Sequence, residues 1–266
     1  MTRSWKLLLD GRPLDGALNM AVDDYLFSRL PESSETYVRF YRWTRPTVSL
    51  GYYQDATKVV NLEACRLRGV GVVRRMTGGK LVLHDAEVTY SVASSDSGVF
   101  STGLKESYRL ISRALLAGLD KMGLHARLAE SSPPSYAKGN LPCFSHPARD
   151  EVEIQGKKII GSAQKRMGAK FIQHGSIPLR TDPALLKAVS RVGEREPEVS
   201  MTSLSEALGR PVDFEEAASR FAAGFSEFFG VRLESLTIEG EEWERVLRIR
   251  GEKYGLDTWT FRKPGL

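Results

Sequence analysis

The feature that most constrains the fold is a run of three strand-like segments between Val152 and Leu179. Two short glycine-containing stretches interrupt it, Gln155-Gly156-Lys157 and Met167-Gly168-Ala169. Glycine at such positions is typical of the tight turns that join neighbouring strands. The sequence therefore predicts a meander of three strands, and one face of such a sheet can form the floor of a pocket.

Helical and strand-like segments alternate along the rest of the chain. Helical spacing of apolar residues occurs at 15–30, 61–68, 107–122, 213–229 and 241–254. Aromatic and β-branched residues predict strands at 37–43, 47–52, 70–75, 81–83 and 88–92. The first two strands flank a turn at Arg45-Pro46, and the polar stretch 131–140 predicts a long surface loop. With 266 residues, the chain is expected to form one large domain over residues 1–266.

Charge and cysteine content limit the class of protein. The longest apolar runs fall short of the roughly 18 residues that span a bilayer, and residues 1–10 lack a signal-peptide pattern. We therefore expect a cytoplasmic protein without a membrane partner. The two cysteines, Cys65 and Cys143, are too few for a disulfide framework and lack zinc-site spacing, so free thiols and no metal are expected. The net charge of +5 favours acidic partners.

The most informative segment is Arg74-Arg75-Met76-Thr77-Gly78-Gly79, with His84 shortly after it. Paired glycines let backbone amides approach a ligand, and neighbouring arginines can bind a phosphate or another anion. The segment therefore suits a phosphate-bearing thioester or a nucleotide. Its spacing is neither that of a Walker loop nor that of the dinucleotide fingerprint, and an ordinary basic turn is the alternative.

Two adjacent lysines, Lys157 and Lys158, begin an otherwise apolar strand. Strand alternation places neighbouring residues on opposite faces, so only one of the two can point into a pocket. A lysine inside an apolar strand must be satisfied by a partner. The local pattern does not choose between the two, and an exposed turn lysine is the alternative.

The two cysteines differ in setting. Cys143 follows the long polar stretch, where a thiol can be presented to a substrate and activated by a nearby cation. Taken alone, this setting still favours a structural role. Cys65 lies in the helix-like segment 61–68, where a small apolar side chain is expected to face the core.

Taken together, these motifs resemble those of lipoate-protein ligases and octanoyltransferases. The resemblance rests on Arg74 to Gly79 with Val82 and His84, Gly156 to Gln164, Gln173 to Ser176, and Lys253-Tyr254 with Trp259. These motifs occur in order over most of the chain. The resemblance implies an α/β fold of mixed, largely antiparallel sheets packed with helices, of the type shared with biotin protein ligases.

Three features favour the cysteine-dependent bacterial octanoyltransferases within this family. Cys143 lies upstream of Lys158, as the nucleophile of that branch does. Lys80 follows the paired glycines, where adenylating ligases more often have a third glycine. The chain also ends soon after Trp259, so no separate C-terminal accessory domain is expected.

The surroundings of the cysteine depart from the usual pattern of that branch. Pro142 precedes Cys143, and Ser145-His146-Pro147 follows soon after it. The preferred acyl donor therefore stays open. An ATP-dependent lipoate-protein ligase and an octanoyl amidotransferase between lipoyl domains remain alternatives.

The resemblance implies a two-step mechanism without a nucleotide or another cofactor. Cys143 would take an octanoyl group from acyl carrier protein, with Lys158 stabilising the thiolate and the developing oxyanion. The acceptor would be a lysine of a lipoyl-type domain, such as the glycine cleavage H protein. The implied substrate-binding residues are Arg74, Arg75, Thr77, Gly78, Gly79 and His84, then Gly161, Ser162 and Ala163, and His174.

A nucleic-acid-binding module is an explanation of a different class, suggested by the net charge and by the aromatic, basic run from Tyr37 to Arg45. RNA-binding signatures are absent and the charges are dispersed, so we expect no nucleic acid partner. A non-catalytic protein that binds carrier domains is disfavoured because Cys143 and Lys158 both occur at matching positions.

Overall fold

The computed structural model describes residues 3–31, 34–100, 103–130, 150–191 and 201–262. Its strands are β1 (Ser4–Leu9), β2 (Thr36–Tyr41), β3 (Thr47–Leu50), β4 (Gly71–Arg74), β5 (Val82–His84), β6 (Glu87–Ser94), β7 (Arg127–Leu128), β8 (Val152–Ile154), β9 (Lys157–Met167), β10 (Lys170–Pro178) and β11 (Arg232–Ser235). Its helices are α1 (Gly16–Ser28), α2 (Ala56–Val59), α3 (Leu62–Leu67), α4 (Leu104–Asp120), α5 (Pro183–Val189), α6 (Leu204–Leu208), α7 (Phe214–Phe229), α8 (Gly240–Ile249) and α9 (Asp257–Thr260), with a π-helical turn at Arg250–Tyr254.

The strands form a large mixed sheet and a small one. The large sheet has the order β11-β1-β2-β6-β10-β9-β8-β7 and the small one the order β4-β3-β5. In the large sheet β1 runs parallel to β11 and β2, whereas the neighbours from β2 to β7 are antiparallel. The predicted meander is β8, β9 and β10, with Gly156 and Gly168 at positive φ in its turns. The predicted fold class, mixed and largely antiparallel, is confirmed.

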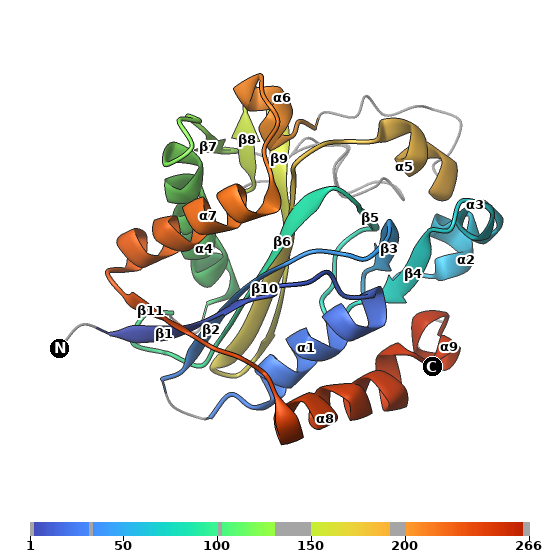
Figure 1. The fold of residues 1–266 in the computed structure, drawn as a ribbon, viewed down its shortest axis with the longest axis horizontal. Helices are drawn as coiled ribbons and strands as arrows, with labels where there is room; N and C mark the ends of the chain where they lie inside the picture. Colours follow the sequence, from blue (N-terminus) through green and yellow to red (C-terminus); the bar gives the residue numbers. More distant parts are fainter. Residues whose placement is uncertain (1–2, 32–33, 101–102, 131–149, 192–200, 263–266) are drawn as a thin grey trace.

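Helices cover both faces of the large sheet (Figure 1). Along β2, Val38 and Phe40 pack in the core cluster that contains residues of α4 and α7, whereas Tyr37 and Tyr41 pack in the cluster that contains residues of α1 and α8. This division follows the two-residue period of a strand. Both faces of β2 are therefore buried.

The predicted strands at 37–43 and 47–52 are β2 and β3, but they do not pair with each other. β2 lies in the large sheet and β3 in the small one, because Trp43 forms a parallel bridge with Leu14 and the carbonyl of Pro46 accepts from the amide of Gly71. The Arg45-Pro46 segment therefore carries the chain from one sheet to the other. This crossing brings the segment after β4 to the large sheet.

The predicted helices are present, with shifted ends. Asp15 caps α1 by accepting from the amide of Leu18 at 2.8 Å, as its side chain suggested. The helix expected at 241–254 is α8 followed by the π-helical turn, where the amide of Gly255 donates to the carbonyl of Arg250. None of the described helices is long and apolar enough to cross a membrane.

Candidate active site

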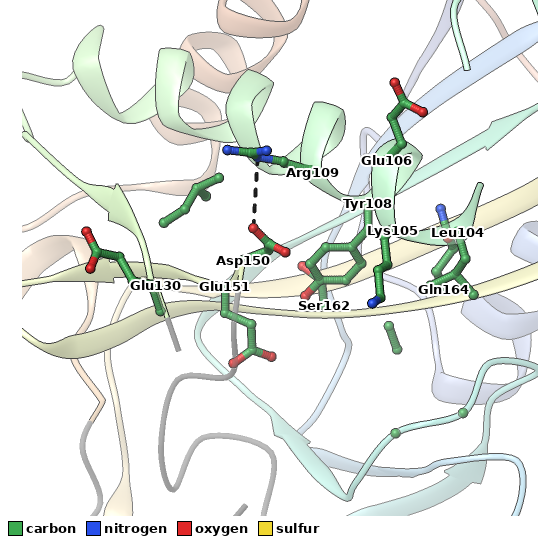
Figure 2. Close-up of a pocket in the computed structure, with 15 residues that line it drawn as sticks. Leu104, Lys105, Glu106, Tyr108, Arg109, Glu130, Asp150, Glu151, Ser162 and Gln164 are labelled. Carbon is green, nitrogen blue, oxygen red and sulfur yellow. Dashed lines mark ion pairs between the residues drawn. The ribbon is translucent and has the colours of Figure 1, made fainter. Parts of the chain in front are cut away.

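A cavity of about 900 Å³ lies between the paired glycines, α4 and the strands β8 and β9 (Figure 2). Four of the predicted substrate-binding residues line it, namely Gly78, Gly79, Ser162 and Ala163. The described lining is completed by residues of α4, of the end of β7 and the two positions after it, of the two positions before β8, and of β9: Leu104, Lys105, Glu106, Tyr108, Arg109, Leu128, Ala129, Glu130, Asp150, Glu151 and Gln164. Cys143, the predicted nucleophile, lies outside the described residues.

Glycine is needed at positions 51 and 79 because the backbone is crowded at this wall. Gly79 has a φ of +91°, and a Cβ at this position would lie 2.8 Å from Nη2 of Arg75. A Cβ on Gly51, at the end of β3, would lie 2.0 Å from the carbonyl oxygen of Gly79. No side chain fits between these segments, so the loop packs directly on β3.

Arg75 is buried behind this loop and is held by protein groups. Its Nε donates to Oγ1 of Thr77 at 3.2 Å, and Nη1 donates to the carbonyl and Oγ of Ser49 at 3.0 and 3.1 Å. Nη2 donates to the carbonyls of Gly78 and Lys80, both at 2.8 Å. All five guanidinium hydrogens therefore have acceptors within the protein, and the predicted substrate-binding arginine forms part of the wall.

Two buried histidines extend this arrangement into the core. His174, on β10, lies 2.6 Å from Oγ1 of Thr77 and 3.1 Å from Oδ2 of Asp23. His84, on β5, lies 2.8 Å from Oγ of Ser49 and 2.7 Å from Oε1 of Glu87. A second, nearly filled cavity of about 20 Å³ is lined by both histidines, Arg75, Gly161, Ser162 and Ala163, among others.

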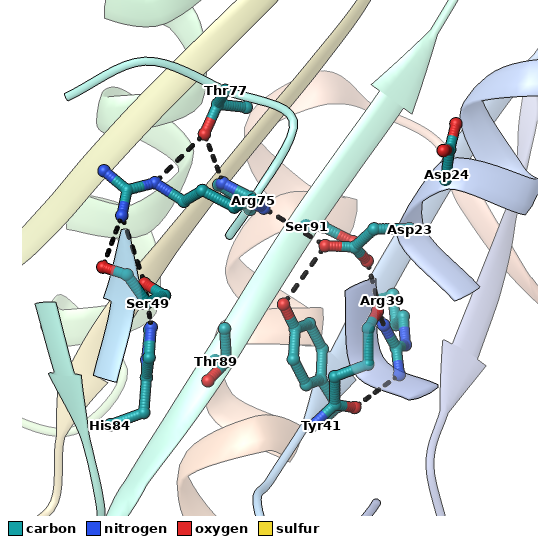
Figure 3. Close-up of polar contacts among 12 residues, drawn as sticks. Asp23, Asp24, Arg39, Tyr41, Ser49, Arg75, Thr77, His84, Thr89 and Ser91 are labelled. Carbon is teal, nitrogen blue, oxygen red and sulfur yellow. Dashed lines mark hydrogen bonds and ion pairs between the residues drawn. The ribbon is translucent and has the colours of Figure 1, made fainter. Parts of the chain in front are cut away.

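The charged residues near His174 come from neighbouring elements, and Figure 3 shows Asp23 beside Arg39 and Arg75 beside Thr77. Burial lowers the pKa of His174 despite the opposing influence of the Asp23 carboxylate. Burial alone would raise the pKa of Asp23, but the hydrogen bond with His174 and the charge of Arg39, 2.9 Å away, bring it below its ordinary value. Near neutral pH His174 is therefore neutral and Asp23 is ionised.

The two adjacent lysines have opposite surroundings, as strand alternation requires. Lys158 is fully buried, and its Nζ lies 2.7 Å from Oε2 of Glu151, which is also buried and lines the large cavity. Lys157 is exposed and its Nζ lies 3.6 Å from Oε1 of Glu206. The structure therefore distinguishes the two lysines where the local pattern could not.

Arg74 has a structural role. Its guanidinium is buried and donates to six backbone carbonyls, those of Gly51, Tyr52, Gln54, Trp259, Thr260 and Arg262. It therefore joins the end of β3 to the segment that contains α9. Cys65 packs in the core beside the small sheet, as predicted, and burial raises the pKa of its thiol.

Sequence reasoning missed four side chains of this region: Asp23, Ser49, Glu87 and Glu151. Each lies at a buried position of a helix or strand or directly before a strand. A signal for Asp23 was present, because it lies among the buried apolar residues of α1, where an acidic side chain needs a partner. The identity of that partner was not visible in the sequence.

The comparisons with known proteins agree with this fold and identify the family. The family model for the lipoyl protein ligase A/B catalytic domain matches residues 15–226, and the chain belongs to this family. It is 40% identical to octanoyltransferase LipM of Kyrpidia tusciae, covering 98% of this chain and 100% of that protein. It is 37% identical to octanoyltransferase LipM of Geobacillus kaustophilus, covering 93% and 94%. The protein is accordingly an acyltransferase that carries out octanoyl transfer in lipoate biosynthesis.

Solved structures with the same fold are lipoate-protein ligases. A lipoate-protein ligase A bound with ATP matches with a TM-score of 0.82 at 23% identity, over 97% of this chain and 98% of that one. The bipartite lipoate protein ligase of Thermoplasma acidophilum, described with its E2 lipoyl domain, also matches with a TM-score of 0.82 at 23% identity, over 99% and 100%. At this identity the likeness concerns the fold.

Proposed function

We propose that this octanoyltransferase takes its acyl group from octanoyl-acyl carrier protein, holds it as a thioester on Cys143 and passes it to a lysine of a lipoyl-type domain, such as the glycine cleavage H protein. The observation that carries the proposal is the buried Lys158, paired with Glu151 at the wall of the large cavity. Burying a cation is costly, and a buried ion pair is a candidate for a functional role when one of its members lines a cavity, as Glu151 does.

The first step forms the acyl-enzyme. The Cys143 thiolate attacks the carbonyl carbon of the donor thioester, and the bond from that carbon to the sulfur of the carrier's prosthetic group breaks. The departing thiolate takes up a proton. Lys158 acts here as a cation that favours the Cys143 thiolate and the developing oxyanion.

In the second step the neutral amine of the acceptor lysine attacks the Cys143 thioester. An amide bond forms, the carbon–sulfur bond of the thioester breaks, and the amine nitrogen loses a proton. Cys143 is released as a thiolate, so one enzyme molecule serves many cycles. Both steps exchange an acyl group already activated as a thioester, and the sequence of reactions consumes no ATP.

The charge of the protein and one structural neighbour support protein partners. The net charge of +5 attracts acidic carrier domains and speeds their encounter with the enzyme. The Thermoplasma acidophilum ligase is described with its own lipoyl domain. The proposal treats residues 1–266 as one catalytic domain that acts in the cytoplasm.

The test is the intact mass of the protein after incubation with three separate donors. Octanoyl-acyl carrier protein should add one octanoyl group, which peptide mapping should place on Cys143. Octanoate with ATP should leave the mass unchanged, which separates this protein from an adenylating ligase. An octanoylated lipoyl domain should label the enzyme less than the carrier protein does, and the opposite order would make it an amidotransferase.

Two cysteine variants provide the matched control. Cys143→Ala should lose both the adduct and the transfer of octanoyl groups to the acceptor. Cys65→Ala should keep both, because Cys65 is 2% exposed and lies in the core beside the small sheet. Transfer at the wild-type rate by Cys143→Ala would end the thioester mechanism.

A further inference from the structure

Two hydrogen-bonded series of the same kind meet at Arg75. One runs from Asp23 through His174 to the hydroxyl of Thr77, and the other runs from Glu87 through His84 to the hydroxyl of Ser49. We call them the aspartate relay and the glutamate relay. The two hydroxyls contact two different nitrogens of one guanidinium, Nε and Nη1.

The chemistry of the end groups determines where each hydrogen lies. The guanidinium can only donate, so both hydroxyl oxygens accept from Arg75. The Asp23 carboxylate is ionised and can only accept, so Nδ1 of His174 carries the hydrogen. Nε2 of His174 is then an acceptor, and the single hydrogen of Thr77 points to it.

The glutamate relay follows the same logic. The carboxylate of Glu87 is surrounded by donors, because the hydroxyls of Thr89 and Ser176 donate to it in addition to Nδ1 of His84. Nδ1 of His84 therefore carries a hydrogen, and in the neutral ring Nε2 accepts from the hydroxyl of Ser49. Both histidines adopt the same tautomer, and each hydroxyl has one defined direction.

These directions leave Nη2 of Arg75 to hold the carbonyls of Gly78 and Lys80. A planar trans peptide points its carbonyl and its amide hydrogen in opposite directions, so the amide of Gly79 is turned away from the guanidinium. Gly79 also lines the large cavity. The orientation of this backbone wall therefore depends on groups from α1, β3, β5, β6 and β10.

We propose that the two relays position the cavity wall for octanoyl transfer. In this view Asp23, His174, Glu87 and His84 are positioning residues, and Arg75 is a scaffold for the Gly78-Gly79 backbone and not a binding residue for the anionic part of the donor. The proposal rests on the proposed function in one respect, namely that this wall borders the acyl group. The competing explanation is a buried polar network that contributes only to stability.

The tautomers can be measured directly by ¹⁵N NMR of protein labelled at histidine. Near neutral pH, His174 should be neutral with its hydrogen on Nδ1, and Nδ1 of His84 should also carry a hydrogen. His125, whose side chain is 95% exposed, provides an internal reference, and His174→Asn and His84→Asn assign the signals. A hydrogen on Nε2 of either ring would overturn the relays. This measurement does not depend on acyl transfer or on Cys143.

The proposed effect of the relays on octanoyl transfer is tested by removing the hydroxyl of residue 77. Thr77→Val leaves Nε of Arg75 without its acceptor, and kcat/KM for octanoyl transfer should fall roughly 10- to 100-fold because the wall is displaced. Thr77→Ser keeps the hydroxyl and should restore kcat/KM to within a few-fold of wild type. Rescue by serine is not expected if residue 77 matters only through the shape of its side chain.

The matched control is Thr36→Val. Thr36 is equally buried, and its hydroxyl lies 2.7 Å from that of Ser94, at the junction of β2 and β6. It should lose comparable stability and keep its transfer rate. Equal losses of transfer in Thr77→Val and Thr36→Val would overturn the positioning role. If wild type transfers octanoyl groups without a Cys143 adduct, the thioester mechanism fails and the relays still stand.

Discussion

The large cavity has two walls with buried cations, and they are built in opposite ways. The glycine-loop wall consists of Thr77 to Lys80 with Arg75 behind them, and the lysine wall consists of Glu151 and Lys158. Through the aspartate relay, Arg75 is connected to distant parts of the chain, since the bonds of that relay join residues 97 and 151 positions apart. Lys158 has its carboxylate partner within the same meander, across the β8–β9 pairing.

This difference indicates that the glycine-loop wall is a scaffold and that the lysine wall takes part in the chemistry. In the glycine-loop wall, the guanidinium donates to neutral oxygen atoms, and the carboxylates of the two relays lie behind histidines. In the lysine wall, a primary ammonium contacts a carboxylate directly, and both groups are less than 5% exposed. A planar guanidinium suits a fixed set of acceptors, whereas an ammonium can change partners during a reaction. Variants in the two walls should therefore fail in different ways.

The largest effect is expected from Lys158→Met. This change leaves the Glu151 carboxylate buried without its cation, so the free energy of unfolding should fall by about 3–5 kcal/mol. Octanoyl transfer should fall by roughly 100-fold or more, because the charge that stabilises the oxyanion is lost. Urea unfolding and a transfer assay on the folded fraction measure the two losses separately.

The double variant Lys158→Met/Glu151→Leu is the control. Replacing both members of a buried pair by apolar residues removes the uncompensated charge and should recover most of the stability. Transfer should stay low. A double variant that regained transfer would show that Lys158 has only a structural role.

Gly79→Val is expected to lose less stability than Lys158→Met, and its loss of octanoyl transfer should be comparable to that of Lys158→Met. Its φ of +91° disfavours a side chain by about 1–2 kcal/mol, and the new Cβ would lie 2.8 Å from Arg75. Displacing the wall by about 1 Å should reduce transfer by roughly 100-fold. Thermal unfolding and steady-state kinetics on the same preparation provide the measurement.

Gly168→Val isolates the backbone strain. Gly168 has a φ of +60° in the β9–β10 turn, and a Cβ there would meet no atom within 4 Å. The variant should lose similar stability and keep its transfer rate. If both valine variants lost transfer equally, the glycine-loop wall would be an ordinary structural turn.

An intermediate effect is expected on the reactivity of Cys143. In a Cys65→Ala background, the pH midpoint of iodoacetamide labelling should rise by about one unit in Lys158→Ala, because a nearby cation favours the thiolate. Lys157→Ala should leave the midpoint unchanged, and Lys158→Arg should lie between wild type and Lys158→Ala, since arginine retains the charge. An unchanged midpoint in Lys158→Ala would contradict the proposed role of the lysine wall.

Local features of the fold could be predicted from the sequence. The β8–β10 meander, the cap at Asp15 and the opposite faces of Lys157 and Lys158 all follow from residue periodicity, turn chemistry or capping preference. The separation of β2 and β3 into two sheets could not be predicted in this way. It depends on the bridge between Trp43 and Leu14, and periodicity says nothing about which strands pair.

The candidate site shows the same division. The motif correctly placed Gly78 and Gly79 at a cavity, since paired glycines signal close backbone approach. The arginines before them looked equally suited to a ligand, but the fold occupies their donors with carbonyls and hydroxyls. The partners of His174 and His84 lie on other elements, and a single sequence does not pair them. The nucleophilic role of Cys143 stays a prediction.

The smallest expected effect is on the pH dependence of the free energy of unfolding, and it tests the glycine-loop wall without a kinetic assay. The folded-state pKa of His174 lies below its ordinary value near 6.5, chiefly because of burial. Below about pH 6.5 the unfolded chain binds a proton at residue 174 that the folded chain does not bind. The free energy of unfolding therefore has its full contribution from His174 above about pH 6.5, and it falls as the pH decreases below that value. One such group contributes a slope of at most about 1.4 kcal/mol per pH unit.

His174→Asn should remove this slope between pH 6.5 and the folded-state pKa, because asparagine does not titrate. The variant should also be less stable at neutral pH, because the hydrogen bond to Thr77 is lost. His125→Asn is the surface control, since the His125 side chain is 95% exposed. Urea unfolding at several pH values measures both slopes. Asp23 adds its own acid sensitivity only below its ordinary value of 3.8, outside this range. A slope that survived in His174→Asn would place the acid-sensitive group elsewhere and remove the argument for a neutral His174 in the glycine-loop wall.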